Sequence, residues 1–328
     1  MPVGIAADSP RRGRLVVGGG VLFTAALIAV ALAPVFGWLL VAFAVLYPAS
    51  GAFVALSQAD LMDAAPARRE QNMARWTLAG SVGGLAGPAV LALAVFVGAG
   101  WRGAYAGCAL VAAAVLVSRA LAPSPPHADG QIHTPFRAAL AGALRALKRG
   151  DVLGALALLE ISDLMLDVLT GYLALYFVDV LHQPSWFGAV VVAVRIASNL
   201  AGDVVSVALL ERIRGTSYVR ATAIAAAFAY AAALLLPGVW TKLAIVALLS
   251  LLTAGWYPVL QARVYQALPG QSGAQLAIGN VFSMVMSPVA LIIGLAATRF
   301  GLSAALWMLI VSPIAIALFL RRPPQDTA

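Results

Sequence analysis

Apolar residues follow one another along the chain in long stretches, and polar residues gather in the short segments between them. Each stretch is about twenty residues long, which is the length that an α-helix needs to cross a hydrocarbon layer of about 30 Å. The stretches lack the apolar-polar alternation of membrane β-strands. The pattern therefore predicts ten membrane-spanning helices, at 15–33, 36–57, 74–98, 100–121, 152–178, 185–209, 218–237, 242–262, 274–297 and 302–320.

Composition strengthens this interpretation and excludes several classes of protein. Hydrophobic residues make up 62% of the 328 positions and charged residues 10%, whereas soluble domains have about 45–50% and about 25%. An ordinary soluble enzyme, a disordered chain and a nucleic-acid-binding module are excluded. Cys108 is the only cysteine in the sequence, and no Cys/His cluster has the spacing of a metal site. Without a phosphate-binding loop or a nucleophile with a partnered base, the sequence predicts no enzyme activity, no metal and no cofactor.

The net charge of +8 reflects orientation in the bilayer. With the N-terminus inside, alternate segments place 17 basic residues on the inner side and 3, Arg102, Lys242 and Arg299, on the outer side. Inner segments of membrane proteins are enriched in Lys and Arg. Both termini are therefore predicted to be cytoplasmic in a multi-pass protein of the cell membrane. High alanine and low lysine content suggest a bacterial inner membrane, with the lipid bilayer as the partner.

A weak internal repeat divides the chain. It relates Gln58, Ala64, Pro66, Gln71, Ala74 and Pro88 to Gln261, Ala267, Pro269, Gln271, Ala274 and Pro288, at offsets of 200–203 residues. The two copies have the same orientation, as in the parallel repeats of some transporters. The partners of the helices at 152–178 and 185–209 would precede Met1, so four helices of one six-helix unit are expected before a complete second unit. The predicted domains are 1–121, a cytoplasmic linker at 122–150 with an amphipathic helix, and 151–328.

Two motifs resemble signatures of the major facilitator superfamily. Gly4, Asp8 and the run Arg11-Arg12-Gly13-Arg14 resemble its loop motif, with two additional residues between Asp8 and Gly13; the run Gly83, Gly87, Pro88 resembles the core of its exchanger motif. The resemblance implies an all-α fold of two six-helix bundles around a substrate cavity, here with the first two helices missing. For Asp8, Arg12, Gly13, Gly83, Gly87 and Pro88 it implies a role in gating, against the alternative of helix packing.

Five ionisable residues are predicted at membrane depth, where such groups are costly and often functional. Glu160, Asp163 and Asp167 share one face of the helix at 152–178, and Arg195, Asn199 and Asp203 share one face of the next helix. One interpretation is a structural ion pair between the two helices. A second is that a carboxylate takes up and releases a proton, with Arg195 tuning its pKa. A third is direct contact with substrate.

Further polar and aromatic residues are candidates for lining a cavity, although side chains of these types also face lipid or neighbouring helices. They are Tyr47, Tyr172, Asn199, Trp256, Tyr257 and Asn280. The function expected is secondary active transport of an unidentified small molecule, coupled to protons and achieved by alternating access between two bundles. The alternative is a truncated or degenerate membrane protein that does not transport and serves as an assembly or regulatory partner.

Overall fold

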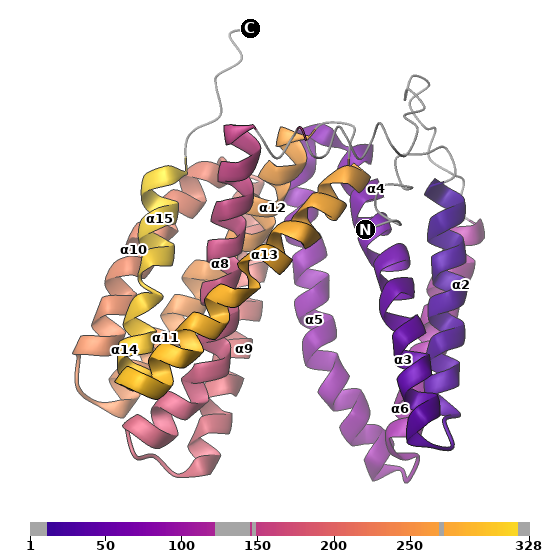
Figure 1. Ribbon diagram of the computed structural model, residues 1–328, viewed down its shortest axis with the longest axis horizontal. Coiled ribbons are helices and arrows are strands. Elements are labelled where there is room, and N and C mark those ends of the chain that lie inside the picture. Colours follow the sequence, from indigo (N-terminus) through magenta and orange to yellow (C-terminus); the bar gives the residue numbers. More distant parts are fainter. Residues whose placement is uncertain (1–11, 122–144, 146–148, 269–271, 321–328) are drawn as a thin grey trace, which may run out of the picture. The chain divides into compact units, whose positions relative to one another are not determined.

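A computed structural model describes residues 12–121, 145, 149–268 and 272–320 (Figure 1). Its elements in this part of the chain are all helical. The chain divides into two compact units. Unit 1 comprises the described residues of Met1–Ala67, Gly83–Lys148 and Leu268–Asn280, and unit 2 those of Arg68–Val82, Arg149–Ala267 and Val281–Ala328. The sequence-based boundaries at 121 and 151 remain a prediction. Asp8 and most of the linker at 122–150 lie outside the described residues.

Helices stand at all ten predicted places. The first four predicted spans are α2 (Arg12–Ala31), α3 (Phe36–Ser50) with η1 (Gly51–Ala55) and α4 (Leu56–Ala64), η2 (Pro66–Arg68) with α5 (Arg69–Phe96), and α6 (Gly100–Leu121). The remaining six are α8 (Gly150–Leu175) with η3 (Tyr176–Val180), α9 (Ser185–Leu210), α10 (Gly215–Leu235), α11 (Val239–Thr253) with α12 (Trp256–Ala267), α13 (Ser272–Phe300), and α14 (Leu302–Met308) with α15 (Val311–Phe319).

Eight stretches of the described residues are long and apolar enough to cross a membrane. The two other predicted spans have evident reasons for falling outside this set. The apolar part of α2, Leu15–Ala31, is shorter, and the 26-residue α8 carries four acidic residues. Large apolar side chains are nevertheless widely exposed, for example Phe36 at 78% and Phe96 at 87%. Such exposure is stable in lipid rather than in water, and the all-α multi-pass membrane fold is confirmed.

Unit 1 is built around α2, which packs against α3, η1 and α6. Two glycines of α2 allow this approach. A Cβ added at Gly19 would lie 2.7 Å from the Cβ of Ala52, and one added at Gly20 would lie 2.7 Å from Leu116 Cδ1. Phe53 packs with Val16 and Leu56 beside these glycines. Small residues therefore bring helix backbones together here, as is common in membrane bundles.

Unit 2 contains pairs of helices in close contact: α9 with α11, α10 with α11 and α15, and α8 with α12 and α15. Its largest fully buried side chains include Trp256, Tyr230 and Tyr265. Lys242, which the sequence assigned to an outer segment, is 5% exposed on α11. Its Nζ donates to the carbonyl oxygen of Ala233 at 2.6 Å and to the hydroxyl of Tyr176 at 3.2 Å. This ammonium group therefore satisfies a carbonyl near the C-terminal end of α10.

Two long helices are divided between the units. In α5 the division falls between Val82 and Gly83, and in α13 between Asn280 and Val281. These are the two helices that the internal repeat relates to each other through Pro88 and Pro288, both of which lie inside their helices. The N-terminal part of α5 belongs to unit 2 and its C-terminal part to unit 1, whereas the N-terminal part of α13 belongs to unit 1 and its C-terminal part to unit 2.

Candidate functional site

Three of the four acidic residues of α8 face one cavity. It has a volume of about 240 Å³ and is formed within unit 2 by α8 and the part of α13 that begins at Val281. Its lining is Glu160, Ile161, Asp163, Leu164, Asp167 and Val168 from α8, and Ser283, Met286, Ser287, Val289 and Ala290 from α13. Positions 160, 163 and 167 fall on one side of an α-helix because they are three and four residues apart.

The carboxylates in this cavity differ in their contacts. Glu160 accepts a hydrogen bond from the hydroxyl of Ser283, which ties α8 to α13. Asp163 is half-buried and Asp167 is exposed. Neither aspartate has a hydrogen bond or ion pair with another described side chain, but each lies within electrostatic range of the other. The cavity therefore presents acidic oxygen atoms that a proton, a cation or a hydroxyl-bearing molecule can use.

Arg195 lies beside α8 without contacting its acids. Its Nη2 donates to the hydroxyl of Thr170 at 2.5 Å and to the carbonyl oxygen of Leu166 at 2.9 Å. In the described part of the chain, no carboxylate oxygen lies within 4 Å of this guanidinium, although Asp167 acts on it electrostatically. In place of the direct ion pair proposed between the two helices, Arg195 makes three hydrogen bonds to α8, two to the hydroxyl of Thr170 and one to the backbone carbonyl of Leu166.

Asp203 points to a different neighbour from Arg195, although both lie on α9. Its carboxylate is 1% exposed, and its Oδ2 accepts hydrogen bonds from Ser81 Oγ at 2.5 Å and from Asn199 Nδ2 at 3.1 Å. Its Oδ1 has no hydrogen-bond partner among the described residues. The polar face of α9 is therefore divided between α8 at Arg195 and the first part of α5 at Asp203.

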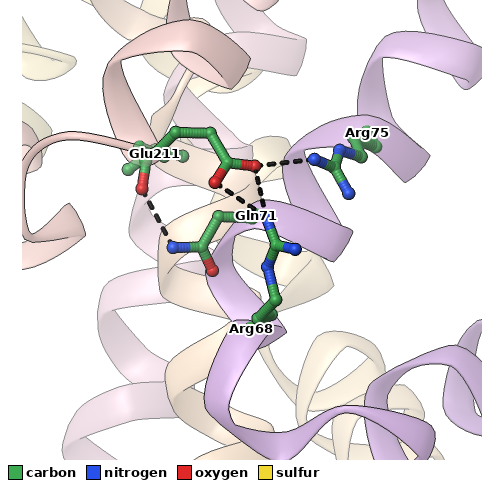
Figure 2. A network of polar contacts seen from close by, with 5 residues as sticks. Arg68, Gln71, Arg75 and Glu211 are labelled. Carbon is green, nitrogen blue, oxygen red and sulfur yellow. Dashed lines mark hydrogen bonds and ion pairs between the residues drawn. The ribbon is translucent and has the colours of Figure 1, made fainter.

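The start of α5 is tied to the end of α9 by a polar network (Figure 2). Arg68 Nη2 lies 2.7 Å and Arg75 Nη2 lies 2.6 Å from the carboxylate oxygens of Glu211. Gln71 Nε2 donates to the carbonyl oxygen of Leu210 at 2.9 Å. The charged side chains are between 36% and 53% exposed, so this network lies in an accessible environment.

Glu70 extends the same contact to α10. Its Oε2 accepts a hydrogen bond from the backbone N–H of Gly215 at 3.0 Å. Gly215 is the first residue of α10, and a helix N-terminus has unsatisfied N–H groups and a favourable field for an anion. Arg263 of α12 acts on Glu70 electrostatically. The first turns of α5 therefore interact with three elements of unit 2, namely the end of α9, the start of α10, and α12.

The remaining candidates have varied environments. Trp256 is fully buried, and its Nε1 donates to the hydroxyl of Thr222 at 3.0 Å. Tyr172 and Tyr257 are half-buried, and Asn280 is exposed. Tyr47, in unit 1, is 86% exposed. A role for these residues in lining a cavity stays a prediction.

The glycines of the α5 motif have open surroundings. No described atom comes within 4 Å of a Cβ added at Gly83 or Gly87, and the same is true of Gly13. Close helix packing at these glycines is therefore absent from the described structure. Pro88 interrupts α5, Arg12 begins α2, and a gating role for the motif residues stays a prediction.

Sequence reasoning missed the hydroxyl partners of the charged residues. Ser81, Thr170 and Ser283 contact Asp203, Arg195 and Glu160 respectively. Serine and threonine are common in membrane helices, where they often bond to their own backbone, so nothing in their spacing distinguished these three. For the network at Glu211 the sequence contains a weak indication, because acidic and basic residues stand at the ends of the predicted helices.

A sequence profile of the Major Facilitator Superfamily matches residues 1–291. The chain belongs to the Major Facilitator Superfamily. This membership confirms the predicted family and places the protein among membrane transporters. No curated protein matches the sequence significantly.

Solved structures of Major Facilitator Superfamily transporters share the fold. A single-residue variant of the fucose:proton symporter FucP of E. coli has a TM-score of 0.77 at 14% identity, over 98% of this chain and 86% of that one. The human organic anion transporter MFSD10 has a TM-score of 0.76 at 18% identity, over 98% and 79%. The proton:xylose symporter XylE, bound to 6-bromo-6-deoxy-D-glucose, has a TM-score of 0.70 at 15% identity, over 96% and 81%. At these identities the likeness establishes the fold alone.

Proposed function

We propose that this protein is a proton-coupled secondary transporter of a small molecule. The observation that carries the proposal is the cavity between α8 and α13, into which Glu160, Asp163 and Asp167 all project. Ionisable groups at membrane depth are costly and are retained where they serve transport. The cycle would alternate access to this cavity as one helical bundle moves against the other.

The arrangement of the acids suits a proton-coupling role. Three carboxylates around a cavity of about 240 Å³ repel one another when all are ionised, and binding a proton relieves part of that repulsion. Arg195 does not neutralise them by direct contact, since it donates to Thr170 and Leu166. Asp163 and Asp167 are therefore available to exchange a proton with an open cavity. Glu160 accepts a hydrogen bond from Ser283, and this bond would break if α8 and α13 moved apart.

The acidic lining also limits the substrate. An organic anion is disfavoured by the ionised carboxylates, whereas a neutral polyhydroxyl compound can donate hydrogen bonds to them and an organic cation can pair with them. Two of the similar structures belong to symporters of the sugars fucose and xylose, and one to an organic anion transporter. A neutral sugar-like molecule or an organic cation is accordingly the proposed substrate class.

The proposed orientation places both termini in the cytoplasm of a bacterium. It is supported by the 17 basic residues on one side of the predicted spans against 3 on the other. In this orientation the ion pairs of Arg68 and Arg75 with Glu211 lie at the cytoplasmic surface. The cavity of α8 and α13 lies deeper in the bilayer.

The proposal is tested with purified protein in liposomes that contain a pH-sensitive dye. L-fucose, D-xylose, an organic cation such as ethidium, and an organic anion are added one at a time, and proton movement and uptake are recorded with and without a pH gradient. We expect a gradient to drive accumulation of a neutral or cationic compound. Asp163→Asn and Asp167→Asn are expected to abolish gradient-driven accumulation while each variant remains folded in the membrane.

Asp179→Asn serves as the matched control, because Asp179 is exposed in η3 and outside the cavity lining. Gradient-driven accumulation that persists in Asp163→Asn, in Asp167→Asn and in the double variant would remove these acids from coupling. Uptake that is insensitive to the gradient would contradict proton coupling. A folded protein that moves no compound of any class would favour a non-transporting partner.

A further inference from the structure

We propose that Asp203 is a second proton-binding site, whose proton is retained while α5 and α9 are in contact and released when they separate. This inference rests on the proposed transport function but concerns a different helix pair from the cavity of α8 and α13. The contacts between α5 and α9 that carry it are called the α5–α9 ladder, and they are made by Arg68, Gln71, Arg75 and Ser81 on α5 and the turn before it with Leu210, Glu211 and Asp203 on α9 and its end.

The ladder runs antiparallel. As the contact advances along α5 from Arg75 to Ser81, its partner moves back along α9 from Glu211 to Asp203. At 1.5 Å per residue, the two rungs are about 9 Å apart along α5 and about 12 Å apart along α9. The outer rung is partly exposed, whereas the inner rung surrounds a carboxylate that is 1% exposed. The α5–α9 ladder therefore has a solvent-exposed outer end and a buried inner end.

Asp203, at the buried inner end, lacks the cation and the full set of hydrogen bonds that stabilise an ionised carboxylate. No described cationic side chain contacts it, and only its Oδ2 receives hydrogen bonds, from Ser81 and Asn199. Its Oδ1 is buried without a partner among the described residues. An ionised carboxylate in such surroundings is strongly unfavourable and becomes neutral instead. In the neutral form Oδ2–H can donate to the hydroxyl of Ser81, and a bare carbonyl-type Oδ1 costs much less than a bare anionic oxygen.

The groups that face Asp203 from neighbouring helices do not compensate its charge. From α10, the buried phenol of Tyr218 lies within electrostatic range. At the adjacent Gly202, a Cβ would meet Leu251 of α11 and Ala254, the residue that follows α11, and neither side chain carries a charge. On α9 itself Arg195 is two turns away and is directed to α8. Among the described residues, the proton is thus the one counter-charge available to Asp203 while the ladder is closed.

Separation of α5 from α9 changes these conditions. It removes the hydroxyl of Ser81 from Oδ2 and admits water to the carboxyl group. The carboxylic acid then gives its proton to water, leaving a hydrated carboxylate and a hydronium ion. Closure requires the reverse step, because the carboxylate must regain a proton before it is buried again. Proton release and the opening of the α5–α9 ladder are therefore coupled.

The test is infrared spectroscopy of the resting protein in lipid, without substrate, during a pH titration. The C=O stretching band of a buried protonated carboxyl group is expected at neutral pH and is expected to be lost in Asp203→Asn. Asp179→Asn is the matched control and should leave the band unchanged. Glu211→Gln breaks the outer rung, so the band should disappear at a pH lower by up to about 0.7 unit than in the unmodified protein, and its exchange in D₂O should be faster.

Each outcome decides between the alternatives. A spectrum that is identical in Asp203→Asn and the unmodified protein would show that Asp203 is ionised in the closed ladder and would overturn the proposal. A band that titrates at the same pH in Glu211→Gln, in Ser81→Ala and in the unmodified protein would show that the proton is independent of the ladder. If Asp203→Asn does not fold, the titrations of Glu211→Gln and Ser81→Ala still decide. Failure here would leave the transport assay of the α8 variants unaffected, so the two proposals fail separately.

Discussion

The guanidinium of Arg195 donates two hydrogen bonds to the hydroxyl of Thr170, from Nη2 at 2.5 Å and from Nε at 3.0 Å. An arginine this deeply buried would ordinarily be expected beside a carboxylate. By using a hydroxyl and the carbonyl oxygen of Leu166 instead, Arg195 joins α9 to α8 and leaves Asp163 and Asp167 without an ion pair among the described residues. The two functions of anchoring the helices and presenting acids are thus performed by different residues.

A double-mutant cycle tests this partnership. Arg195→Ala should lower stability in detergent by about 1–3 kcal/mol, since it removes charged hydrogen bonds in a buried site. Arg195→Ala and Thr170→Ala should be non-additive by about 0.5–2 kcal/mol, whereas Arg195→Ala and Asp163→Asn should be additive within error. Thermal unfolding followed by circular dichroism gives these values. A coupling to Asp163 larger than that to Thr170 would restore the ion-pair interpretation.

Glu70 and Gly215 make a second sharp prediction. A Cβ added at Gly215 would lie 2.5 Å from Glu70 Oε2 and 2.9 Å from Val259 Cγ2, so Gly215→Ala should destabilise the protein by about 1–3 kcal/mol. Removing the carboxylate should restore part of this loss, and Gly215→Ala with Glu70→Ala should be more stable than the sum of the two single changes implies. Strict additivity in thermal unfolding would show that the two residues do not contact each other.

Two sets of glycines should respond differently to enlargement. A Cβ at Gly202 would lie 2.7 Å from Ala254 Cβ and 3.0 Å from the backbone of Leu251, whereas Gly83 and Gly87 have open surroundings. Gly202→Val should separate α9 from α11 and cost about 1–3 kcal/mol. Gly83→Ala and Gly87→Ala should change stability by less than about 0.5 kcal/mol. Destabilisation by the two alanine variants comparable to that by Gly202→Val would reveal close packing in the α5 motif.

The ion pairs of Glu211 should be weak and sensitive to salt. Their side chains are between 36% and 53% exposed, and exposed pairs contribute about 0–1 kcal/mol. Glu211→Gln should therefore lower stability by no more than about 1 kcal/mol at low salt, and the difference should vanish near 1 M salt, where screening acts over about 3 Å. Gln71→Ala is the control, because its lost hydrogen bond to Leu210 is uncharged and should not depend on salt.

Hydropathy alone located the helices, because backbone groups in hydrocarbon must bond internally and each span needs a minimum apolar length. The superfamily was also evident from the motifs around Asp8 and Pro88. Side-chain partners were not predictable to the same degree. The periodicity at Arg195 and Asp203 shows that they share a face of α9, but it cannot show that this face meets two different helices. Lys242 was assigned to an outer segment because charge suggests water, whereas the end of α10 supplies acceptors that allow its burial.

The local irregularities of the helices were likewise beyond sequence reasoning. The segments Gly51–Ala55 and Tyr176–Val180 are π-helical, a geometry that occurs mostly as single-turn bulges within α-helices. Pro48 precedes the first of them, which supplies one physical cause for the disturbance. No corresponding residue marks the second. Such bulges depend on how neighbouring helices pack, and a single sequence does not specify that packing.

The antiparallel register of α5 on α9 also makes sliding directional. Helices that shift past each other by discrete steps do so by about one turn, or 5.4 Å. A slide in one direction would replace Ser81 opposite Asp203 by Thr77, which carries another hydroxyl, and would set Gln71 near Glu211 in place of Arg75. A slide in the opposite direction would bring Leu85 against the carboxyl group and leave it without a donor. The spacing of hydroxyls along α5 is therefore expected to favour a one-turn step in the first direction over a step in the second.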